Sequence, residues 1–129
     1  MTDYSKIIEE ISFNGQGLVP AIAQDYKTGE VLMMAWMNED SIIETLSKKQ
    51  ICYFSRSRNK LWRKGESSGQ IQKLKEFIID CDGDTILLKV EQNGVACHTG
   101  RRNCFYKTVK NDEIIVNQDV MIDPDNLYK

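Results

Sequence analysis

Five consecutive residues near the middle of the chain combine three carboxylates with one thiol. They are Asp80, Cys81, Asp82, Gly83 and Asp84. Carboxylate oxygens are the preferred ligands of Mg²⁺ and Ca²⁺, whereas thiolates select Zn²⁺. The interleaved order therefore indicates that the fold holds two different metals close together.

Two more thiols follow at Cys97 and Cys104, and the first of them stands beside His98, the only histidine of the chain. A structural zinc site is usually closed by four protein ligands, whereas a catalytic site keeps one position open for water. The three thiols of Cys81, Cys97 and Cys104 therefore favour a catalytic zinc site.

The three aspartates also resemble the start of an EF-hand calcium loop, with Glu91 at its twelfth position. That loop needs glycine at the sixth position, which is Thr85 here. It also needs a helix afterwards, whereas residues 86–90 are typical of a strand. The sequence therefore disfavours an EF-hand. A solvated acidic turn at a strand end is the remaining structural alternative.

The four cysteines offer a further alternative, two disulfides, for which three pairings exist. The segment Met1–Ile11 carries acidic residues and no apolar run of signal-peptide length, so it does not predict secretion. No stretch approaches the roughly 20 apolar residues of a membrane span. We therefore expect a cytoplasmic protein with reduced thiols and no membrane contact, which favours metal binding or catalysis over disulfides.

Length and charge limit the domain count and the partners. A chain of 129 residues, 41% of them hydrophobic, predicts one domain with one core, residues 1–129. The net charge of −2 disfavours a general nucleic-acid binder, which usually has a basic domain. An anionic partner must therefore be met locally. Residues 56–64 offer such a place, because five of these nine are basic: Arg56, Arg58, Lys60, Arg63 and Lys64.

This basic segment has the chemistry of a phosphate site, because arginine side chains match phosphate oxygens bidentately. The alternation of Arg56, Arg58 and Lys60 directly after the strand-like residues 52–54 predicts three cations on one face. The small-residue segment Gly65–Gly69 is typical of loops whose backbone amides approach an anion. A solvated basic loop is the alternative for the charge run.

The hydrophobic pattern predicts an α+β domain, mainly an antiparallel β-sheet with a few short helices, and with the metal-binding residues on strand ends and loops. Helices are predicted over Tyr4–Ile11 and, with Asn38 as N-cap, over Glu39–Lys48. Leu18–Asp25 and Glu30–Trp36 are predicted to form a hairpin. Further strands are predicted at Ile51–Ser55, Lys75–Cys81, Thr85–Glu91, Phe105–Val109 and Glu113–Val116.

The same pattern assigns several large side chains to the core. In the longer helix, one face should point inward. In the second hairpin strand, methionine is a common filler of irregular gaps, so a core role is favoured over a copper site. The residues expected in the core are Ile42, Ile43, Leu46, Met33, Met34, Met37 and Trp36.

Eight segments between residues 18 and 106 carry longer motifs. They are Leu18–Asp25, Gly29–Asn38, Ser55–Arg58, Leu61–Trp62, Lys64–Gly69, Asp80–Asp84, Cys97–Gly100 and Cys104–Phe105. In this order they closely resemble the phosphoribosyl-AMP cyclohydrolase family, which acts at the third step of histidine biosynthesis. Two positions depart from the family pattern: Asn103 stands where serine or threonine is expected, and Cys52 is not part of the pattern. Neither touches a metal ligand.

The resemblance implies a small nucleotide substrate, an AMP whose purine N1 carries a second phosphoribosyl group. Its six-membered ring is a cationic amidine with an electrophilic C6. Water adds there, and the bond between C6 and N1 breaks to leave a carboxamide and a formimino linkage. Because the chain ends at Lys129, with no room for the pyrophosphohydrolase domain fused to this enzyme in many organisms, the resemblance implies a monofunctional form.

The resemblance also implies cofactors and an assembly. In the family pattern Cys81, Cys97 and Cys104 bind Zn²⁺, which lowers the pKa of a bound water so that hydroxide attacks C6. This zinc site is assembled from two subunits of an intertwined homodimer. The residues that the pattern assigns to Mg²⁺ are Asp80, Asp82 and Asp84.

Side-chain roles follow from the same resemblance. His98 directly follows a zinc ligand, so we expect it to be catalytic: it would orient or deprotonate the attacking water, or pass a proton to the departing nitrogen. A lone histidine is otherwise more often structural. The residues expected to bind the substrate are Arg56, Arg58, Lys60, Lys64, Glu66 and Arg101.

Two other function classes fit parts of the sequence. A nucleobase deaminase also directs hydroxide at a purine C6, but its His-x-Glu and Pro-Cys-x-x-Cys signature is missing here. A zinc-stabilised RNA-binding module would use the basic segment with Trp62 stacked on a base. Such a module should have a fourth zinc ligand and lack the aspartate trio.

Overall fold

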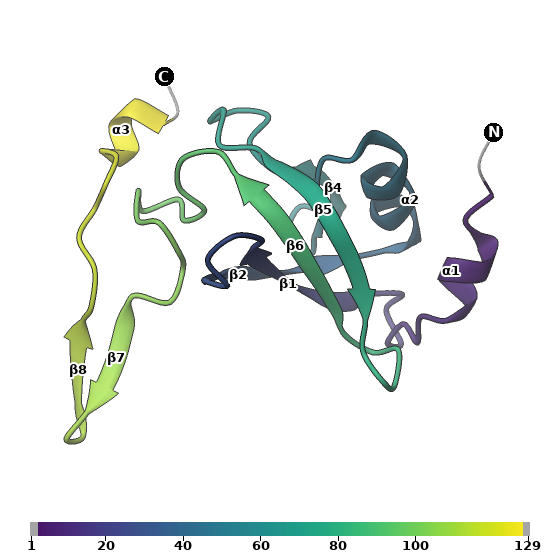
Figure 1. The fold of residues 1–129 in the computed structure, drawn as a ribbon, viewed down its shortest axis with the longest axis horizontal. Coiled ribbons are helices and arrows are strands. Elements are labelled where there is room, and N and C mark those ends of the chain that lie inside the picture. Colours follow the sequence, from purple (N-terminus) through teal and green to yellow (C-terminus); the bar gives the residue numbers. More distant parts are fainter. Residues whose placement is uncertain (1–2, 128–129) are drawn as a thin grey trace.

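The computed structural model describes residues 3–127, which form eight strands and three helices (Figure 1). The helices are α1 (Ser5–Glu9), α2 (Glu39–Lys48) and α3 (Pro124–Leu127). The strands are β1 (Val19–Asp25), β2 (Val31–Met37), β3 (Cys52–Ser55), β4 (Lys60–Arg63), β5 (Gln72–Ile79), β6 (Ile86–Gln92), β7 (Lys107–Lys110) and β8 (Glu113–Val116). The predicted α+β class is confirmed. Within residues 3–127, no helix is long and apolar enough to cross a membrane.

Six of the strands form one mixed sheet in the order β4-β3-β2-β1-β6-β5. Four of its five strand pairs are antiparallel, and the pair β1–β6 near its middle is parallel. The prediction of a mainly antiparallel sheet holds for the hairpins, but the sheet is mixed. The parallel pair arises because the chain passes through α2 and four strands, β2 to β5, before β6 returns to lie beside β1. A pattern within one strand does not specify such a distant neighbour.

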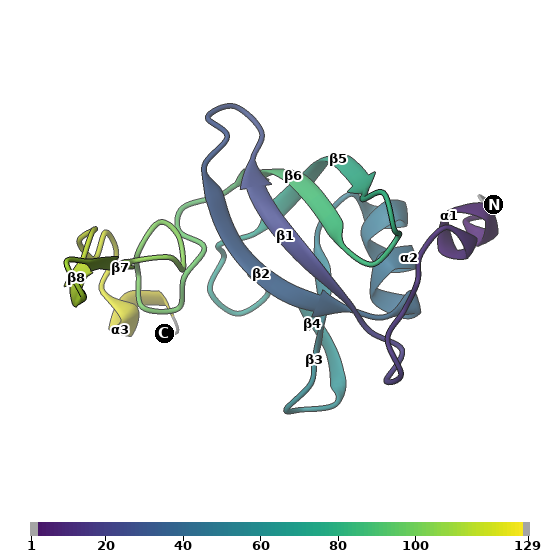
Figure 2. The ribbon, with the colours of Figure 1, turned by 90° about the horizontal axis from the view of Figure 1, so that it is seen from below.

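The sheet is curled (Figure 2). The short segment before β3 bonds to β5, at the other edge of the sheet: the Ile51 amide donates to the Gln72 carbonyl at 3.0 Å, and the Leu74 amide donates to the Lys49 carbonyl at 2.8 Å. The two edges of the sheet are therefore tied together. The β3–β4 hairpin projects from the curled body of the sheet (Figure 2).

Helix α2 has the predicted bounds because its first turn is capped by side chains. The Asn38 side chain accepts from the Ser41 amide at 2.9 Å, and the Asn38 amide donates to the Ser41 hydroxyl at 2.9 Å. This reciprocal pair satisfies the backbone amides of Asn38 and Ser41, which no carbonyl of the helix can pair with. Ile42 and Leu46 are buried as predicted, whereas Ile43 is 37% exposed, because it points away from the face shared by the other two.

Strand β2 buries Leu32, Met33 and Met37 but leaves two other large side chains outside the core, which corrects two of the predicted core residues. Met33 and Met37 are buried, whereas Met34 is 47% exposed and Trp36 is only half-buried. Successive side chains of a strand point to opposite faces, so Met34 and Trp36 share the outer face. Two large apolar side chains are thus available outside the core.

The C-terminal arm (residues 105–121) stands apart from the curled sheet (Figure 1). Its two strands, β7 and β8, pair only with each other in the sheet topology, and every residue of both strands is exposed. The exposed large apolar residues of the arm are Phe105, Val109, Ile114, Ile115, Val116, Val120 and Met121. So many exposed apolar side chains in one segment are typical of an interaction surface.

Candidate functional site

One pocket brings several predicted site residues together. We call it the histidine pocket; its volume is about 740 Å³, within the range typical of ligand sites. It is lined by Ser55, Ser57, Arg58, Trp62, Lys64, Gly65, Glu66, Ser67, Ser68 and His98. The basic segment, the small-residue loop and the chain's histidine therefore meet at one surface although they are up to 43 residues apart (98 − 55).

The basic segment is a hairpin, which corrects the predicted alternation of its charges. Strand β3 ends at Ser55, residues 56–59 form the turn with Asn59 at φ 53°, and β4 begins at Lys60. The three cations therefore do not lie on one strand face. Arg58 lines the histidine pocket, Arg56 lines a neighbouring pocket, and Lys60 lines neither of these two pockets.

The neighbouring pocket, which we call the tryptophan pocket, has a volume of about 620 Å³. It is lined by Met34, Ala35, Trp36, Phe54, Ser55, Arg56, Ser57 and Trp62. The Arg56 guanidinium lies 4.8 Å from the centroid of the Trp36 ring, a cation–π contact that holds the side chain over the aromatic face. The outward faces of Met34 and Trp36 thus form one wall of this pocket.

Two of the three predicted zinc ligands lie together. Burial, with the adjacent Cys97 sulfur, raises the pKa of the Cys104 thiol to about 12. The Thr99 hydroxyl donates to the Cys97 sulfur at 3.0 Å. Two neighbouring thiols offer two of the four ligands of a tetrahedral zinc site, and zinc binding to such thiols displaces their protons.

Lys64 lies beside the same sulfurs. Its ammonium donates to the Ala96 carbonyl at 2.8 Å. Burial holds the pKa of Lys64 below its usual range, although the neighbouring Cys104 and Cys97 sulfurs favour its charged form. The side chain lines the histidine pocket, but its ammonium is hydrogen-bonded to the backbone of the loop that carries Cys97 and Cys104, which we call the cysteine loop.

Backbone hydrogen bonds fix the loop that carries Cys97 and Cys104. The Ala96 amide donates to the Arg102 carbonyl at 2.9 Å, which closes the loop on itself. The Cys104 amide donates to the Leu32 carbonyl of β2 at 2.8 Å. The loop is therefore anchored to the sheet directly at one of its thiols.

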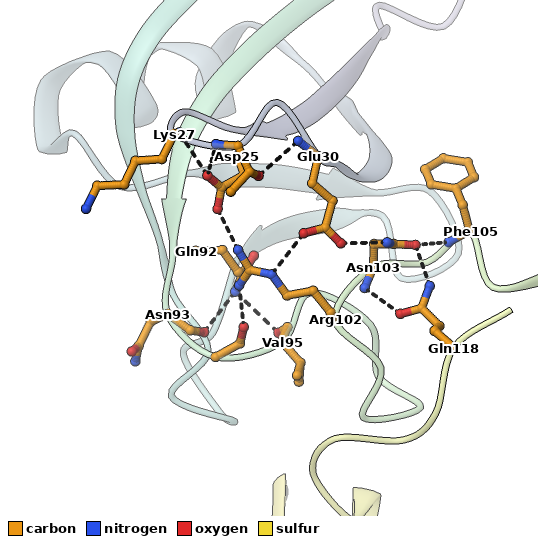
Figure 3. A network of polar contacts seen from close by, with 12 residues as sticks. Asp25, Lys27, Glu30, Gln92, Asn93, Val95, Arg102, Asn103, Phe105 and Gln118 are labelled. Atoms are coloured by element: carbon orange, nitrogen blue, oxygen red, sulfur yellow. Dashed lines mark hydrogen bonds and ion pairs between the residues drawn. The ribbon is translucent and has the colours of Figure 1, made fainter.

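Arg102 ties this loop to the turn between β1 and β2 (Figure 3). Its guanidinium pairs with Asp25 and with Glu30, and it also donates to the Gly94 carbonyl at 2.7 Å. This role of Arg102 was not predicted from the sequence. Two sequence features could have indicated it. Asp25 and Glu30 are two acidic residues on either side of a predicted turn, and Arg102 is a basic residue between two expected zinc ligands.

Asn103, where the resemblance predicted serine or threonine, has partners that suit an amide. Its Nδ2 donates to Glu30 at 2.7 Å, and its Oδ1 accepts from the Gln118 side chain at 2.8 Å (Figure 3). A serine or threonine hydroxyl has fewer donors than this carboxamide. The substitution therefore extends the Arg102 network towards the C-terminal arm.

Asp25 gives the fold an acid-sensitive contribution. Burial alone would raise the pKa of Asp25, but the Thr28 and Lys27 amides and Arg102 outweigh it and hold that pKa below its usual range. Because the folded-state pKa lies below the unfolded value of about 3.9, the carboxylate stabilises the fold above that pH. The contribution disappears as the pH falls through the folded-state pKa.

Asp25→Asn is therefore expected to lower the free energy of unfolding by about 2 kcal/mol at pH 7, since a charge-assisted bond is lost. The difference from the wild type should shrink as the pH falls from about 4 towards 2. Thermal unfolding followed by circular dichroism over this range measures it. Asp112→Asn, at an exposed turn position with φ 61°, is the control and should not reproduce the pH dependence. A constant difference at every pH contradicts the expectation.

The predicted magnesium ligands lie in the tight turn between β5 and β6. The Asp80 carboxylate accepts from the Asp84 amide at 3.0 Å, and the hydrogen bond and charge of Asp80 raise the pKa of Asp84. Gly83 has φ +74°, and a Cβ there would collide with the Glu10 carbonyl oxygen, so the turn needs glycine. Carboxylates this close repel each other unless a proton or a cation lies between them.

Cys81 lies in the same turn, far from the other two thiols. The turn leads into β6, and the cysteine loop follows the far end of that strand (Figure 1). Seven residues of strand span roughly 20 Å. Within residues 3–127, no three His, Cys, Asp or Glu side chains are grouped so that they could hold a metal ion. One chain therefore presents two thiols at one end of β6 and one at the other.

Two further side chains lie outside both pockets. The Arg101 guanidinium lies 4.2 Å from the Tyr106 ring centroid and donates to the Gln118 carbonyl at 3.1 Å, so it faces the C-terminal arm.

Cys52 is buried, and its burial and the neighbouring Glu44 raise its pKa to about 12. All four cysteines are free thiols, so the disulfide alternative is not realised.

Comparisons with known proteins agree on one family. The sequence model of the family described as Phosphoribosyl-AMP cyclohydrolase matches residues 33–106. The chain is 61% identical over 127 residues to the protein of that name from Paramagnetospirillum magneticum, covering 98% of this chain and 96% of the relative. The corresponding protein of Granulibacter bethesdensis is 58% identical over 125 residues, covering 96% and 98%. That of Halorhodospira halophila is 53% identical over 126 residues, covering 98% and 89%.

Proposed function

Because this chain belongs to the phosphoribosyl-AMP cyclohydrolase family, we propose that it opens the purine ring of N1-(5-phosphoribosyl)-AMP by hydrolysis between N1 and C6. The chain is an enzyme, a hydrolase, and the reaction is a step of histidine biosynthesis. The product is the formimino-aminoimidazole carboxamide ribonucleotide. Ring opening, not loss of the exocyclic amine, separates this reaction from that of a nucleobase deaminase.

The histidine pocket is the observation that carries the proposal. It unites an arginine for a phosphate, a carboxylate for a ribose or a cation, and a histidine for proton transfer: Arg58, Glu66 and His98. The hydroxyl groups of Ser55 and Ser57 on the same wall offer further hydrogen bonds to an anion. The pocket therefore has the polar groups that a phosphorylated nucleoside requires.

The reaction needs one water and three proton movements. The water oxygen bonds to C6, and one of its protons leaves for a base. When the bond between C6 and N1 breaks, its electron pair goes to N1, which takes a proton and remains bound to the formimino carbon, while the second proton of the water leaves as the hydroxyl on C6 becomes the carboxamide carbonyl. His98 is exposed in the pocket, and its imidazole, which can both accept and donate a proton, would carry such a proton.

Zinc and magnesium are the proposed cofactors. Cys97 and Cys104 would hold Zn²⁺ together with Cys81, and the donor chemistry fits because thiolates select that ion. When bound, Zn²⁺ lowers the pKa of a coordinated water and so supplies hydroxide at neutral pH. The turn carboxylates Asp80, Asp82 and Asp84 offer the oxygen ligands that Mg²⁺ prefers; within residues 3–127 of one chain they are not grouped around a single metal position.

A homodimer with a shared zinc site is the proposed assembly. The support is the position of Cys81, which β6 separates from Cys97 and Cys104 by roughly 20 Å. A second chain placed with its Cys81 turn against the cysteine loop completes a set of three thiols. In a twofold dimer the same contact occurs twice, so both sites are completed together.

The C-terminal arm gives the dimer independent support. The arm begins directly after Cys104 and exposes apolar residues such as Val109 and Ile114, which are 73% and 72% exposed. An isolated two-stranded hairpin is marginally stable in water. A partner subunit that reaches the cysteine loop also lies beside this arm and would cover its apolar side chains.

The purified protein is expected to turn over N1-(5-phosphoribosyl)-AMP and to leave AMP and adenosine unchanged. Only the first compound has the cationic amidine that makes C6 electrophilic. Ultraviolet absorbance follows the conversion of the purine to an imidazole. Chelation should stop the reaction, and Zn²⁺ with Mg²⁺ should restore it. A metal-loaded protein that leaves all three compounds unchanged would contradict the proposal.

A further inference from the structure

The two pockets share a wall that belongs to the β3–β4 hairpin. Ser55, Ser57 and Trp62 line both the histidine pocket and the tryptophan pocket. Trp62 is 36% exposed, and its ring packs against the buried Tyr53 with 5.4 Å between the ring centroids. Tyr53 thus supports the Trp62 indole from the core side, while part of the indole remains exposed to both pockets.

Each pocket has its own arginine. Arg56 lies in the tryptophan pocket and Arg58 in the histidine pocket. Within residues 3–127, neither guanidinium forms an ion pair with a carboxylate. Both charges are therefore available to a ligand, and the turn of the hairpin directs them to different sides of one wall.

The substrate of the proposed function also has two anionic ends. One phosphate is on the ribose at N1, in the six-membered ring, and the other is on the ribose at N9, in the five-membered ring. C6 is bonded directly to N1. A substrate whose C6 faces His98 therefore brings the N1-linked phosphoribosyl group into the histidine pocket and directs the N9-linked group away from it.

We infer that Arg58 binds the N1-linked phosphate and Arg56 binds the N9-linked phosphate, with the purine lying along Trp62 between them. Arginine is suited to both positions because its planar fork bonds two phosphate oxygens at once. Trp62 suits the middle because a purine stacks on an indole. The assignment rests on the proposed function, since only that substrate requires two phosphate subsites on either side of one base.

AMP separates the two subsites, because its single phosphate is the N9-linked one. The experiment measures the dissociation constant of AMP by calorimetry on the metal-loaded protein and on three variants. Arg56→Ala is expected to weaken AMP binding by about tenfold or more, as loss of a charge-assisted contact implies. Arg58→Ala should stay within about twofold of the wild type, because the contact that it removes is absent from the AMP complex.

Lys6→Ala is the matched control, since it removes one exposed positive charge on α1 that lines neither pocket. It should bind AMP like the wild type. With the doubly phosphorylated substrate, both arginine variants should raise KM about tenfold or more. The exposed positions of both arginines predict unchanged melting temperatures.

Three results would overturn the assignment. They are a larger loss of AMP affinity in Arg58→Ala than in Arg56→Ala, equal losses in both, and an absence of AMP binding to the wild type. Failure of the proposed function looks different: the protein would bind AMP in the expected pattern but would not open the doubly phosphorylated substrate.

Discussion

Cys81→Ser and Cys97→Ser proteins are each expected to be inactive, and a refolded mixture of the two is expected to recover up to about a quarter of wild-type activity. In a mixed dimer one site contains the intact Cys81 of one chain and the intact Cys97 and Cys104 of the other. The second site collects both defects. Random pairing makes half of the dimers mixed, and each mixed dimer has one complete site.

The matched control is a mixture of Cys97→Ser with Cys104→Ser. These two thiols lie together in one chain, so every site in every mixed dimer lacks one of them and no activity should return. Elemental analysis gives a second readout, because zinc should return only to the first mixture. If subunit exchange is demonstrated and the first mixture stays as inactive as its components, the shared site is wrong.

His98→Ala is expected to lower kcat by about 10² to 10⁴, the usual contribution of a positioned acid or base. KM and zinc content should change little, because the imidazole lines the pocket without being one of the thiols. The side chain is exposed, so the melting temperature should also be retained. Steady-state kinetics and elemental analysis on the same preparation measure these quantities.

Added imidazole provides the control for this variant. A small base that diffuses into the vacated space should restore part of the rate of His98→Ala and should not stimulate the wild type. If kcat of His98→Ala falls by less than tenfold, another group carries the proton. Loss of zinc together with activity would show that His98 acts on the metal site instead.

Local signals in the sequence were sufficient for elements whose ends are fixed by nearby residues. Helix α2 starts at Glu39 as predicted, because the Asn38 cap lies in the adjacent position. The hairpin of β1 and β2 was also predicted within about a residue at each end. In both cases the contacts that define the element lie within a few residues of one another.

Strand β4 was missed because its sequence is dominated by charges. Lys60 and Arg63 at its ends are typical of a solvated loop, and only the two residues between them, Leu61 and Trp62, are apolar. The strand lies at the edge of the sheet, where charged residues are common because they discourage pairing with other chains. The prediction that Arg56, Arg58 and Lys60 share one strand face was wrong because residues 56–59 form the turn between β3 and β4.

The site was only partly accessible from the sequence. The basic segment pointed to Arg58, and the family resemblance supplied the expected roles of Glu66 and His98; the structure places all three at one pocket. The ion pairs of Arg102 with Asp25 and Glu30 depend on the three-dimensional return of residue 102 to residue 25. No local periodicity encodes a contact over 77 residues.

The parallel pairing of β1 with β6 also determines when the protein can fold during synthesis. The first four strands can pair in sequence order, but the open side of β1 has no neighbour until residues 86–92 have been made. Bringing β6 beside β1 closes a loop that runs from Asp25 to Ile86, and this closure costs entropy before the two strands gain any hydrogen bonds. The core is therefore completed late, after about two-thirds of the chain has been made.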